Sequence, residues 1–277
     1  MPNQIHNHLS KSDPAFVVIM STYNRPKEVL RSVESVRKQS YKHWELYVVI
    51  DDVKSDYSQL QHQCNDDEKI HIIQNLNNIG KNKSLNCVLD ILSERKFLGY
   101  VVYLDDDDWL NEDCLLDFAK TIRELHNPNW IVSKRTNSET NASFTIAPAL
   151  SDNFNYNTDV LLMRKFYGDA THCINFSFTS QCRFSTHIKN AEEWIYFSQV
   201  ARDTNFYYLD KTGTFSNGYN LQGLTNMHRN NFKNYLAVLT DVWHFRLFSL
   251  SIILYLFGRL IKIIMRNLFR NSYKVRS

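Results

Sequence analysis

The sequence predicts an α/β fold, in which a mostly parallel sheet is flanked by helices, with a basic amphipathic helical tail. Three observations support this prediction. Short apolar runs alternate with segments of helical apolar spacing, polar side chains follow directly after the apolar runs, and cations recur every three or four residues near the end. Strands separated by helices of this length are joined by right-handed crossovers, so we expect them to lie parallel.

The composition is that of a folded globular protein. Of the 277 residues, 43% are hydrophobic and 22% are charged, so the chain can bury a large core. From Asp241 to the end, seven Lys and Arg residues accompany one acidic residue, whereas the preceding body has more acidic than basic residues. This mildly acidic body argues against nucleic acid as a partner.

The cysteines and the first residues indicate the compartment. The five cysteines are odd in number and include no Cys-x-x-Cys pair, which argues against a zinc site or disulfide framework and favours a reducing compartment. Residues 1–14 are polar and lack the apolar core of a signal peptide. We therefore expect a flexible leader, followed by a body that stays in the cytoplasm.

Four strands and three helices are predicted in order. Residues 15–20, 44–50 and 69–74 are strand-like, and helical spacing of apolar residues recurs at 29–36 and 85–92. The fourth strand begins at Tyr100 and leads into four consecutive aspartates. After it, Asn111 is predicted to cap a helix whose acidic first turn suits the positive end of the helix dipole.

Three polar segments should meet at one edge of this sheet: residues 21–25, the pair Asp51 and Asp52, and residues 105–108. The reason is that ligands of an open parallel sheet bind outside the carboxyl ends of its strands. Four adjacent carboxylates need a counter-charge, since like charges about 4 Å apart repel by ~4 kcal/mol at an effective dielectric of ~20. Mg²⁺ or Mn²⁺ is the expected counter-ion, and a solvated acidic turn is the alternative for the four acids taken alone.

The chain contains no glycine-rich phosphate loop. Neither Gly-x-Gly-x-x-Gly nor Gly-x-x-x-x-Gly-Lys-Ser/Thr occurs, and there are only seven glycines. A metal held by carboxylates can bind phosphate instead. The predicted ligand is therefore a metal-bound nucleoside diphosphate with an attached group.

Five motifs are similar, in order and spacing, to those of glycosyltransferase family 2. They are VVIMSTYNRP at 17–26, VVIDD at 48–52, NIG with SLN within 78–86, LDDDDWL at 104–110 and AEEW at 191–194. The resemblance covers roughly residues 15–225 and is specific through the combination of the first and fourth motifs. It implies a GT-A fold and inverting transfer of a sugar from a nucleoside diphosphate, as in bacterial surface-polysaccharide assembly.

The resemblance also implies roles for individual residues. Ser21, Tyr23 and Arg25 correspond to the first nucleotide-contacting loop, with Tyr23 against the base. Asp52 is similar to the carboxylate that accepts the ring N–H of uracil, which favours a UDP-sugar. The other implied site residues are Asn86, Asp105 and Asp107 for the nucleotide sugar, Asp107 and Asp108 for the metal, and Glu193 as catalytic base.

These residue types suit the reaction. A metal acts as a Lewis acid on the departing diphosphate, and a carboxylate that deprotonates the acceptor hydroxyl is typically worth ~10²–10⁴-fold in rate. The alternative for Glu193 is that it forms, with Glu192, the exposed acidic first turn of a helix running to Ala201.

The sequence departs from the family pattern in three places. Leu85 replaces an arginine of the third motif, so Lys81 or Lys83 is the candidate contact for the diphosphate. The usual Gly-Ser after Asp52 is absent. Residues 218–225 resemble the family's closing loop but lack its histidine, so a third protein ligand for the metal is not identified.

The chain is predicted to divide into a nucleotide-sugar-binding half at 15–135, an acceptor-binding half at 136–235 and a membrane-associating tail at 236–277. The uncharged run at 247–257 is too short to span a bilayer. Beyond it, four cations alternate with apolar side chains, as in a helix that lies on an anionic membrane: Arg259, Lys262, Arg266 and Arg270. Packing of this helix on the enzyme body or on a partner chain is the alternative.

Together these inferences predict a cytoplasmic glycosyltransferase, peripherally attached to the inner face of the cell membrane. It would use Mn²⁺ or Mg²⁺ to transfer a sugar from a nucleoside diphosphate donor, with a UDP-sugar favoured, to a hydroxyl of a glycan or of a lipid-linked glycan. Two other classes stay open at this point. One is a metal-dependent nucleotidyltransferase, and the other is a non-catalytic, membrane-associated nucleotide-sugar-binding protein of the same fold.

Overall fold

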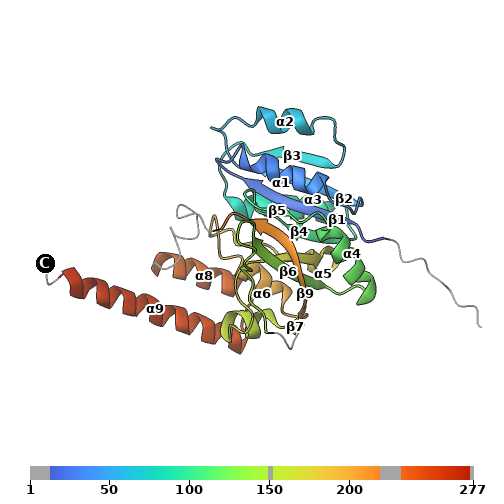
Figure 1. Ribbon diagram of the computed structural model, residues 1–277. Helices are drawn as coiled ribbons and strands as arrows, with labels where there is room; N and C mark the ends of the chain where they lie inside the picture. The colour runs from blue at the N-terminus through green and yellow to red at the C-terminus, as the bar shows by residue number, and fades with distance from the viewer. Residues whose placement is uncertain (1–12, 149–151, 219–231, 275–277) are drawn as a thin grey trace, which may run out of the picture.

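A computed structural model describes residues 13–148, 152–218 and 232–274, and it shows one sheet with helices on both faces (Figure 1). In this part of the chain the strand order is β3-β2-β1-β4-β8-β6-β9-β5, and β7 pairs with β9. Residues 1–12 of the predicted leader and residues 219–225 of the predicted closing loop lie outside the described residues.

The first four strands are the ones that the sequence predicts, and they are parallel. They are β1 (Phe16–Thr22), β2 (Trp44–Ile50), β3 (Ile70–Gln74) and β4 (Tyr100–Tyr103). In register, Ile19 of β1 lies between Tyr47 of β2 and Tyr103 of β4. All three strands therefore end at one edge of the sheet, as expected.

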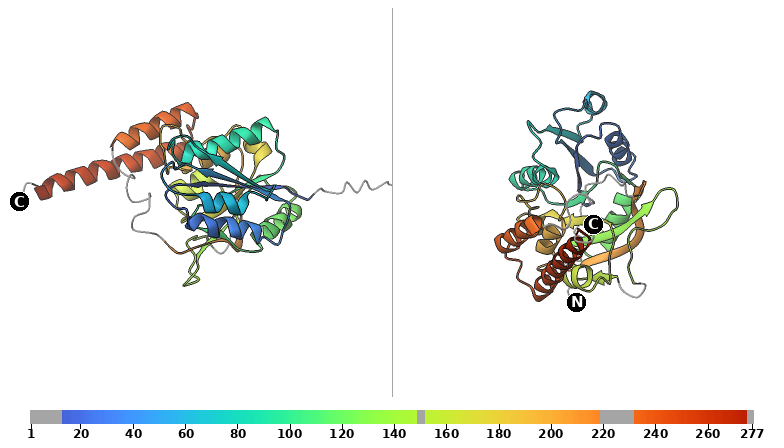
Figure 2. Two further views of the ribbon diagram at one scale, coloured as in Figure 1. Left: turned by 90° about the horizontal axis from the view of Figure 1, so that it is seen from above. Right: turned by 90° about the vertical axis from the view of Figure 1, so that its left-hand side faces the viewer.

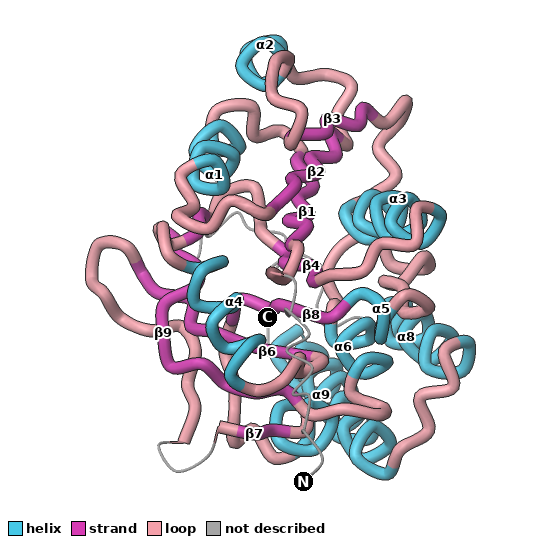
Figure 3. Tube along the Cα trace, turned by 90° about the vertical axis from the view of Figure 1, so that its right-hand side faces the viewer, coloured by secondary structure: helices cyan, strands magenta, loops and turns pink. Residues whose placement is uncertain are grey.

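Helices cover both faces of these strands. They are α1 (Glu28–Arg37), α2 (Ser58–Cys64), α3 (Lys81–Glu94) and α4 (Cys114–Glu124). The side chains of α1, α2 and α4 belong to one apolar cluster and those of α3 to the other, and Figure 3 shows α1 and α3 on opposite sides of the strands. The sequence did not predict the short helix α2.

The start of α4 corrects the prediction for Asn111. Asp113 occupies the N-cap position, and its side chain makes no capping hydrogen bond. Asn111 lies two residues earlier, where its Oδ1 accepts a hydrogen bond from the Asp113 backbone N–H at 3.1 Å. Asn111 therefore closes the turn before the helix, which is a common local bond for this side chain.

The sheet becomes mixed beyond β4. Its other strands are β5 (Trp109–Leu110), β6 (Trp130–Asn137), β7 (Asn153–Phe154), β8 (Ala170–Asn175) and β9 (Phe206–Ser216). Strand β8 is antiparallel to both β4 and β6, whereas β9 is parallel to β6 and antiparallel to β5. The α/β prediction is confirmed, and its parallel part is limited to the first four strands and the β6–β9 pair.

In the second half, the described residues form five helical segments. They are the π-helix η1 (Tyr156–Leu162), α5 (Phe176–Thr179), α6 (Trp194–Val200), α8 (Phe232–His244) and α9 (Leu250–Lys274). Trp130 of β6 is fully buried and stacks against Tyr156 and Phe197 at centroid distances of 5.6 Å. Large aromatic pairs of this kind stabilise the apolar layer that holds η1 and α6 on the sheet.

The C-terminal helices pack on the same layer and then extend away from the sheet (Figure 2). Their inward side chains are buried in the cluster that also contains α3 and α6: Tyr235, Val238, Val242, Ile252, Leu256 and Ile263. The Tyr235 hydroxyl donates to the Leu256 carbonyl at 3.1 Å, which joins α8 to α9. The domain boundary at residue 235 stays a prediction, and the structure adds that buried contacts cross it.

Candidate active site

The four aspartates lie in the turn between β4 and β5, with alternating exposure. The side chains of Asp106 and Asp108 are 8% and 5% exposed, whereas those of Asp105 and Asp107 are 45% and 30% exposed. The Ser32 hydroxyl of α1 lies within hydrogen-bond distance of the Asp106 and Asp108 carbonyls, at 2.9 and 2.5 Å, and fixes the turn. Two carboxylates are therefore turned inward and two toward solvent.

Three cationic side chains of the protein neutralise this cluster. Arg25 Nη1 lies 2.7 Å from Asp106 Oδ1 and 2.8 Å from Asp107 Oδ2. The other two ion pairs join Lys81 Nζ to Asp105 at 2.6 Å and Arg135 Nη2 to Asp108 at 2.9 Å. The sequence predicted a divalent metal as the counter-charge of the four aspartates, and part of this positive charge comes from protein side chains. Arg135 carried no signal in the sequence, because it lies on β6, outside all five matched motifs.

The inward and outward carboxylates differ in pKa. The charge of Lys81 lowers the pKa of Asp105 to about 2, against the opposing effect of burial. Burial raises the pKa of Asp106 to about 6, although Arg25 opposes the increase. Burial likewise raises the pKa of Asp108 to about 7, against the charge of Arg135. At neutral pH the outward Asp105 is therefore charged, whereas the two inward carboxyls, with pKa values of about 6 and about 7, titrate near neutral pH.

Lys81 also connects the acidic turn to the predicted base. Its Nζ lies 3.3 Å from Glu193 Oε1, so one ammonium contacts both Asp105 and Glu193. Burial lowers the pKa of Lys81, but the charges of Asp105 and Glu193 raise it more, and the net pKa is above its ordinary value. Lys81 therefore stays charged between the two carboxylates. Glu193 occupies the N-cap position of α6, and its side chain is 33% exposed.

Asp52 ties the loop after β1 to the loop after β2. Its two oxygens accept hydrogen bonds from the backbone N–H groups of Asn24, at 3.0 Å, and Lys54, at 2.8 Å. Burial raises the pKa of Asp52, but hydrogen bonds from Ser55, Lys54 and Asn24 outweigh it and hold the pKa below its usual value. The loop so fixed carries Tyr23, which is 51% exposed, one residue after the end of β1. Ser21 lies within β1 and is half-buried.

Asp51 positions the start of α3. Its carboxylate accepts hydrogen bonds from the backbone N–H groups of Ile79, at 2.8 Å, and Gly80, at 2.7 Å, and from the Asn75 amide at 2.8 Å. Gly80 has φ +92°, and a Cβ at this position would lie 2.6 Å from the Lys189 carbonyl oxygen, so only glycine fits. This arrangement places Lys81 at the first position of α3, pointing to the acidic turn.

Asn86 is not brought to this site. It lies on α3, where its amide donates to the Phe184 carbonyl at 3.0 Å and its Oδ1 accepts from the Phe184 N–H at 2.9 Å. Both ends of the side chain are used inside the protein, and Asn86 is 7% exposed. The predicted contact with the nucleotide sugar therefore has no geometric support here, and the observed role is to hold the chain before α6.

A divalent metal fits this turn only where substrate completes its coordination. Within the residues that the structure describes, no group of three or more His, Cys, Asp or Glu side chains is arranged to hold a metal. Mg²⁺ is often bound through one or two carboxylates together with substrate phosphates. Asp107 presents a partly exposed carboxylate for such a site, and this carboxylate is also paired with Arg25 at 2.8 Å. Asp108 is paired with Arg135, so its role as a ligand stays a prediction that would require this pair to separate.

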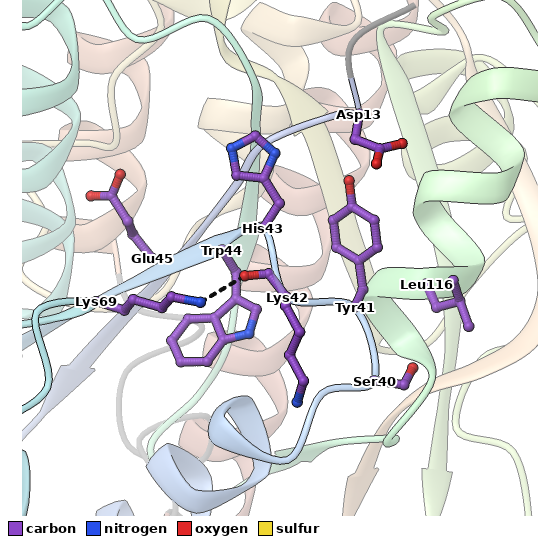
Figure 4. A pocket seen from close by; sticks show the side chains of 9 residues that line it. All are labelled: Asp13, Ser40, Tyr41, Lys42, His43, Trp44, Glu45, Lys69 and Leu116. Atoms are coloured by element: carbon purple, nitrogen blue, oxygen red, sulfur yellow. Dashed lines mark hydrogen bonds between the residues drawn. The ribbon is translucent and has the colours of Figure 1, made fainter.

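A hollow of about 740 Å³ lies at the opposite edge of the sheet (Figure 4). It is lined by residues around the amino ends of β1, β2 and β3, including Asp13, Trp44 and Lys69. Because the acidic turn and Glu193 lie beyond the carboxyl ends of the strands, this hollow is separate from the candidate active site. The chemistry of the side chains, rather than the size of a cavity, therefore locates the site.

The C-terminal helices correct one part of the predicted membrane surface. Arg259 does not belong to an outward cationic face, because its side chain is 11% exposed and its guanidinium pairs with Glu192 at 2.7 Å. Lys262 and Arg266 are exposed, and the side chain of Arg270 lies outside the described residues. Large apolar side chains are also exposed on α8 and α9, among them Trp243 at 76% and Phe257 at 61%. Within the described residues, no helix is both long and apolar enough to cross a bilayer.

Curated relatives of this chain are glycosyltransferases. It is 26% identical over 200 residues to the GalNAc(5)-diNAcBac-PP-undecaprenol beta-1,3-glucosyltransferase of Campylobacter jejuni. This match covers 70% of this chain and 62% of that protein. It is 29% identical over 128 residues to the UDP-Glc:alpha-D-GlcNAc-diphosphoundecaprenol beta-1,3-glucosyltransferase WfgD of Escherichia coli, covering 42% and 49%. The chain thus spans about half to two thirds of the length of these relatives.

The fold is also similar to that of a solved structure. The crystal structure of residues 1–349 of TarS from S. aureus, in complex with UDP-GlcNAc, has a TM-score of 0.66 to this chain at 18% identity. The match covers 82% of this chain and 65% of that one, and it confirms the predicted GT-A fold. The family model named Glycosyl transferase family 2 matches residues 17–183, more than half of the chain. The chain therefore belongs to glycosyl transferase family 2.

Proposed function

We propose that this enzyme transfers a sugar, with inversion, from a UDP-sugar to a hydroxyl of a glycan or lipid-linked glycan in bacterial surface-polysaccharide assembly. The observation that carries this proposal is that Lys81 joins Asp105 and Glu193 at the carboxyl ends of the parallel strands. The names of two relatives support the acceptor class, since both include an undecaprenol-linked glycan. The UDP-GlcNAc complex of TarS supports the donor class.

In this reaction Glu193 acts as the general base. Its carboxylate takes the proton of the acceptor hydroxyl while the acceptor oxygen forms a bond to the anomeric carbon, and the bond from that carbon to the nucleoside diphosphate breaks. One carboxylate is sufficient, because attack from the face opposite the leaving group inverts the anomeric centre directly. The contact from Lys81 holds Glu193 at a fixed distance from the turn that faces the donor.

Side chains at the strand ends bind the donor. The exposed ring of Tyr23 offers a surface for stacking of the base. The ionised Asp52 below the same loop is 3% exposed and already accepts two backbone N–H groups, and a remaining lone pair would accept the ring N–H of uracil. Arg25 and Lys81 place positive charge next to the diphosphate. Asp107, with Asp108 if Arg135 releases it, would hold Mn²⁺ or Mg²⁺ with the diphosphate oxygens. The bound ion would supply Lewis-acid stabilisation of the leaving group.

The outward surface of α8 and α9 binds the inner face of the cell membrane in this proposal. Exposed apolar residues on these two helices are Phe232, Leu236, Leu239, Trp243, Leu250, Ile253, Leu254, Phe257, Ile261, Ile264 and Met265, and Phe248 lies in the connection between them. The exposed Lys262 and Arg266 accompany them on α9. Trp and Phe enter the headgroup boundary, and cations near an anionic surface add ~1 kcal/mol each. Such an orientation places the active site near a lipid-linked acceptor.

A donor screen tests the enzymatic proposal. Release of UDP is measured from UDP-Glc, UDP-GlcNAc, UDP-Gal and UDP-GalNAc, with Mn²⁺ and with EDTA, in the presence of membrane lipid extract as the acceptor source. We expect metal-dependent UDP release from at least one donor and an inverted anomeric proton signal in the product. Pyrophosphate release from a nucleoside triphosphate would instead indicate a nucleotidyltransferase. UDP-sugar binding without turnover would indicate a non-catalytic binding protein.

Vesicle sedimentation tests the membrane surface. We expect the full chain to sediment with vesicles that contain phosphatidylglycerol and to stay in solution with phosphatidylcholine alone. The double substitution Trp243→Ser and Phe257→Ser should reduce sedimentation several-fold. Leu76→Ser with Leu98→Ser is a matched control, because these leucines are 89% and 79% exposed but lie outside the C-terminal helices. Equal binding by both double variants would reject this surface.

A further inference from the structure

We propose that Arg259 of α9 is a positioning residue for Glu193, so that the C-terminal helix is a working part of the active site. This inference rests on the proposed function, because it assumes that Glu193 is the base. Arg259 makes a bidentate pair with Glu192, the residue directly before Glu193. Nη1 lies 2.7 Å from Glu192 Oε2, and Nη2 lies 2.8 Å from Oε1. The two side chains are 11% and 6% exposed.

The backbone at this point needs such support. Ala191 and Glu192 have φ values of +65° and +60°. The left-handed conformation is unfavourable for residues with a Cβ, and two in succession persist only where surrounding contacts fix them. Glu192 also accepts a hydrogen bond from the Trp194 indole N–H. Its carboxylate therefore fixes the turn on both sides of Glu193, and Arg259 fixes that carboxylate.

The other contacts of this segment come from α3 and α8. The Asn82 amide of α3 donates to the Ile188 and Ala191 carbonyls at 2.9 and 3.1 Å. From α8, the buried Asp241 contacts His187 Nδ1 at 2.6 Å and the Ser185 hydroxyl at 2.5 Å. The Asn234 amide of α8 also donates to Glu192 Oε1, at 3.3 Å. Arg259 makes the two shorter bonds to this carboxylate and supplies its positive charge, directly next to the base.

The bidentate geometry matters for the reaction. A guanidinium binds a carboxylate through two parallel N–H groups, which fixes orientation as well as distance, whereas an ammonium fixes only the distance. Loss of Arg259 would leave Glu192 buried without its cation and would let the left-handed turn relax. Glu193 would then shift from its place beside Lys81, and a displacement of about 1 Å at a reacting group can cost ~10²-fold in rate.

The test compares Arg259→Gln and Arg259→Lys with Arg95→Gln in the full chain. Arg95 is a matched control because it makes the same bidentate pair, at 2.7 and 3.0 Å with Glu45, and lies just past the end of α3 opposite to Lys81. We expect Arg259→Gln to lower kcat for UDP release ~10–100-fold while the Kd for UDP with Mn²⁺ changes less than about twofold. Arg259→Lys should lie between wild type and Arg259→Gln, and Arg95→Gln should stay within about twofold of wild type.

The double variant Glu192→Gln with Arg259→Gln tests the pairing. If Arg259 acts through Glu192, its kcat should lie within about threefold of that of Arg259→Gln, because residues in one contact are not additive. If the kcat losses of the single variants Glu192→Gln and Arg259→Gln multiply in the double variant, the proposal is overturned. Vesicle binding of Arg259→Gln should equal that of wild type, since this side chain faces inward. A fall in activity that parallels loss of vesicle binding would also overturn it.

Amide hydrogen exchange supplies a measurement without turnover. In the unliganded full chain, Arg259→Gln should increase exchange in peptides that cover residues 190–196, and Arg95→Gln should not. Unchanged exchange there would overturn the proposal. If Glu193→Gln itself keeps full turnover, the proposed function fails. If Glu193→Gln is inactive while Arg259→Gln keeps wild-type kcat and exchange, only this inference fails.

Discussion

The donor side and the base side of the active site are built in different ways. Tyr23, Asp52 and Asp105 each follow a parallel strand by one or two residues, so the sheet itself places them. Glu193 follows no strand and is placed by side chains from α3 and α9. Lys81 of α3 lies 112 positions from Glu193 along the chain, and Arg259 of α9 lies 67 positions from Glu192. A strand pattern can therefore locate a donor site, whereas the position of the base depends on long-range packing.

The same contrast appears within the acidic turn. Asp105 faces outward, and Lys81 lowers its pKa, whereas Asp106 faces inward, and burial raises its pKa. Adjacent residues of one type therefore have opposite electrostatic behaviour because the side chains alternate between the core and the crevice. Five substitutions test these two contrasts.

Glu193→Gln should have the largest effect. Loss of the base should reduce kcat for UDP release by ~10²–10⁴-fold, because proton removal by a positioned carboxylate contributes about that factor. The Kd for UDP should stay nearly unchanged, since the donor side is built from other elements. Steady-state kinetics and calorimetry with UDP measure the two quantities. Unchanged turnover would assign the base to another residue.

Asp51→Ala should have its effect on folding. The buried Gly80 N–H, the half-buried Ile79 N–H and the Asn75 amide would lose their acceptor, which should reduce the free energy of unfolding by about 3 kcal/mol. Chemical denaturation measures this loss. Asp66→Ala changes an exposed aspartate that precedes β3, and it should change the free energy of unfolding by less than about 0.5 kcal/mol. Equal stability of the two variants would show that Asp51 does not hold the start of α3.

Asp106→Asn should change how stability depends on pH. The folded pKa of about 6 lies above the ordinary value of 3.8, so the folded protein binds more protons than the unfolded chain between these values. The contribution of Asp106 is therefore complete below about pH 4 and is lost as the pH rises through 6. Relative to Asp106→Asn, wild type should lose up to about 3 kcal/mol between pH 4 and 7.

Asp105→Asn is the opposite case. Because the folded pKa of Asp105 is lowered to about 2, its contribution is present above about pH 4 and is lost as the pH falls through 2. Denaturant titrations at several pH values compare both variants with wild type. Parallel curves for Asp105→Asn and Asp106→Asn would contradict the inward and outward assignment of these two side chains.

Tyr23→Ala should have the smallest effect. Loss of the stacking surface should weaken UDP binding by ~5–100-fold, since stacking of a base on an aromatic ring is worth ~1–3 kcal/mol. Stability should be unchanged because the ring is 51% exposed. Tyr23→Phe keeps the ring and should bind UDP like wild type. Equal UDP binding by Tyr23→Ala and wild type would place the base elsewhere.

The sequence predicted the features that depend on short spacing. The four parallel strands, the helices α1 and α3 and the polar segments at the strand ends follow from apolar periods of two and 3.6 residues, which neighbouring residues carry. The antiparallel insertion of β8 between β4 and β6 was not predicted, because its pairing joins segments that are far apart along the chain. The motif around Asn86 predicted a contact with the nucleotide sugar, but the backbone of Phe184 hydrogen-bonds to both the N–H and the oxygen of the Asn86 amide.

By itself, the sequence determined the class of fold and the edge of the sheet where the site lies, because both follow from local periodicity and from the direction of parallel strands. Only the tertiary structure decided which cation neutralises each carboxylate and that Arg259 faces Glu192 instead of the surface. The physical reason is that ion pairs between distant segments depend on how helices pack, and packing is set by the whole core rather than by the residues that make the pair.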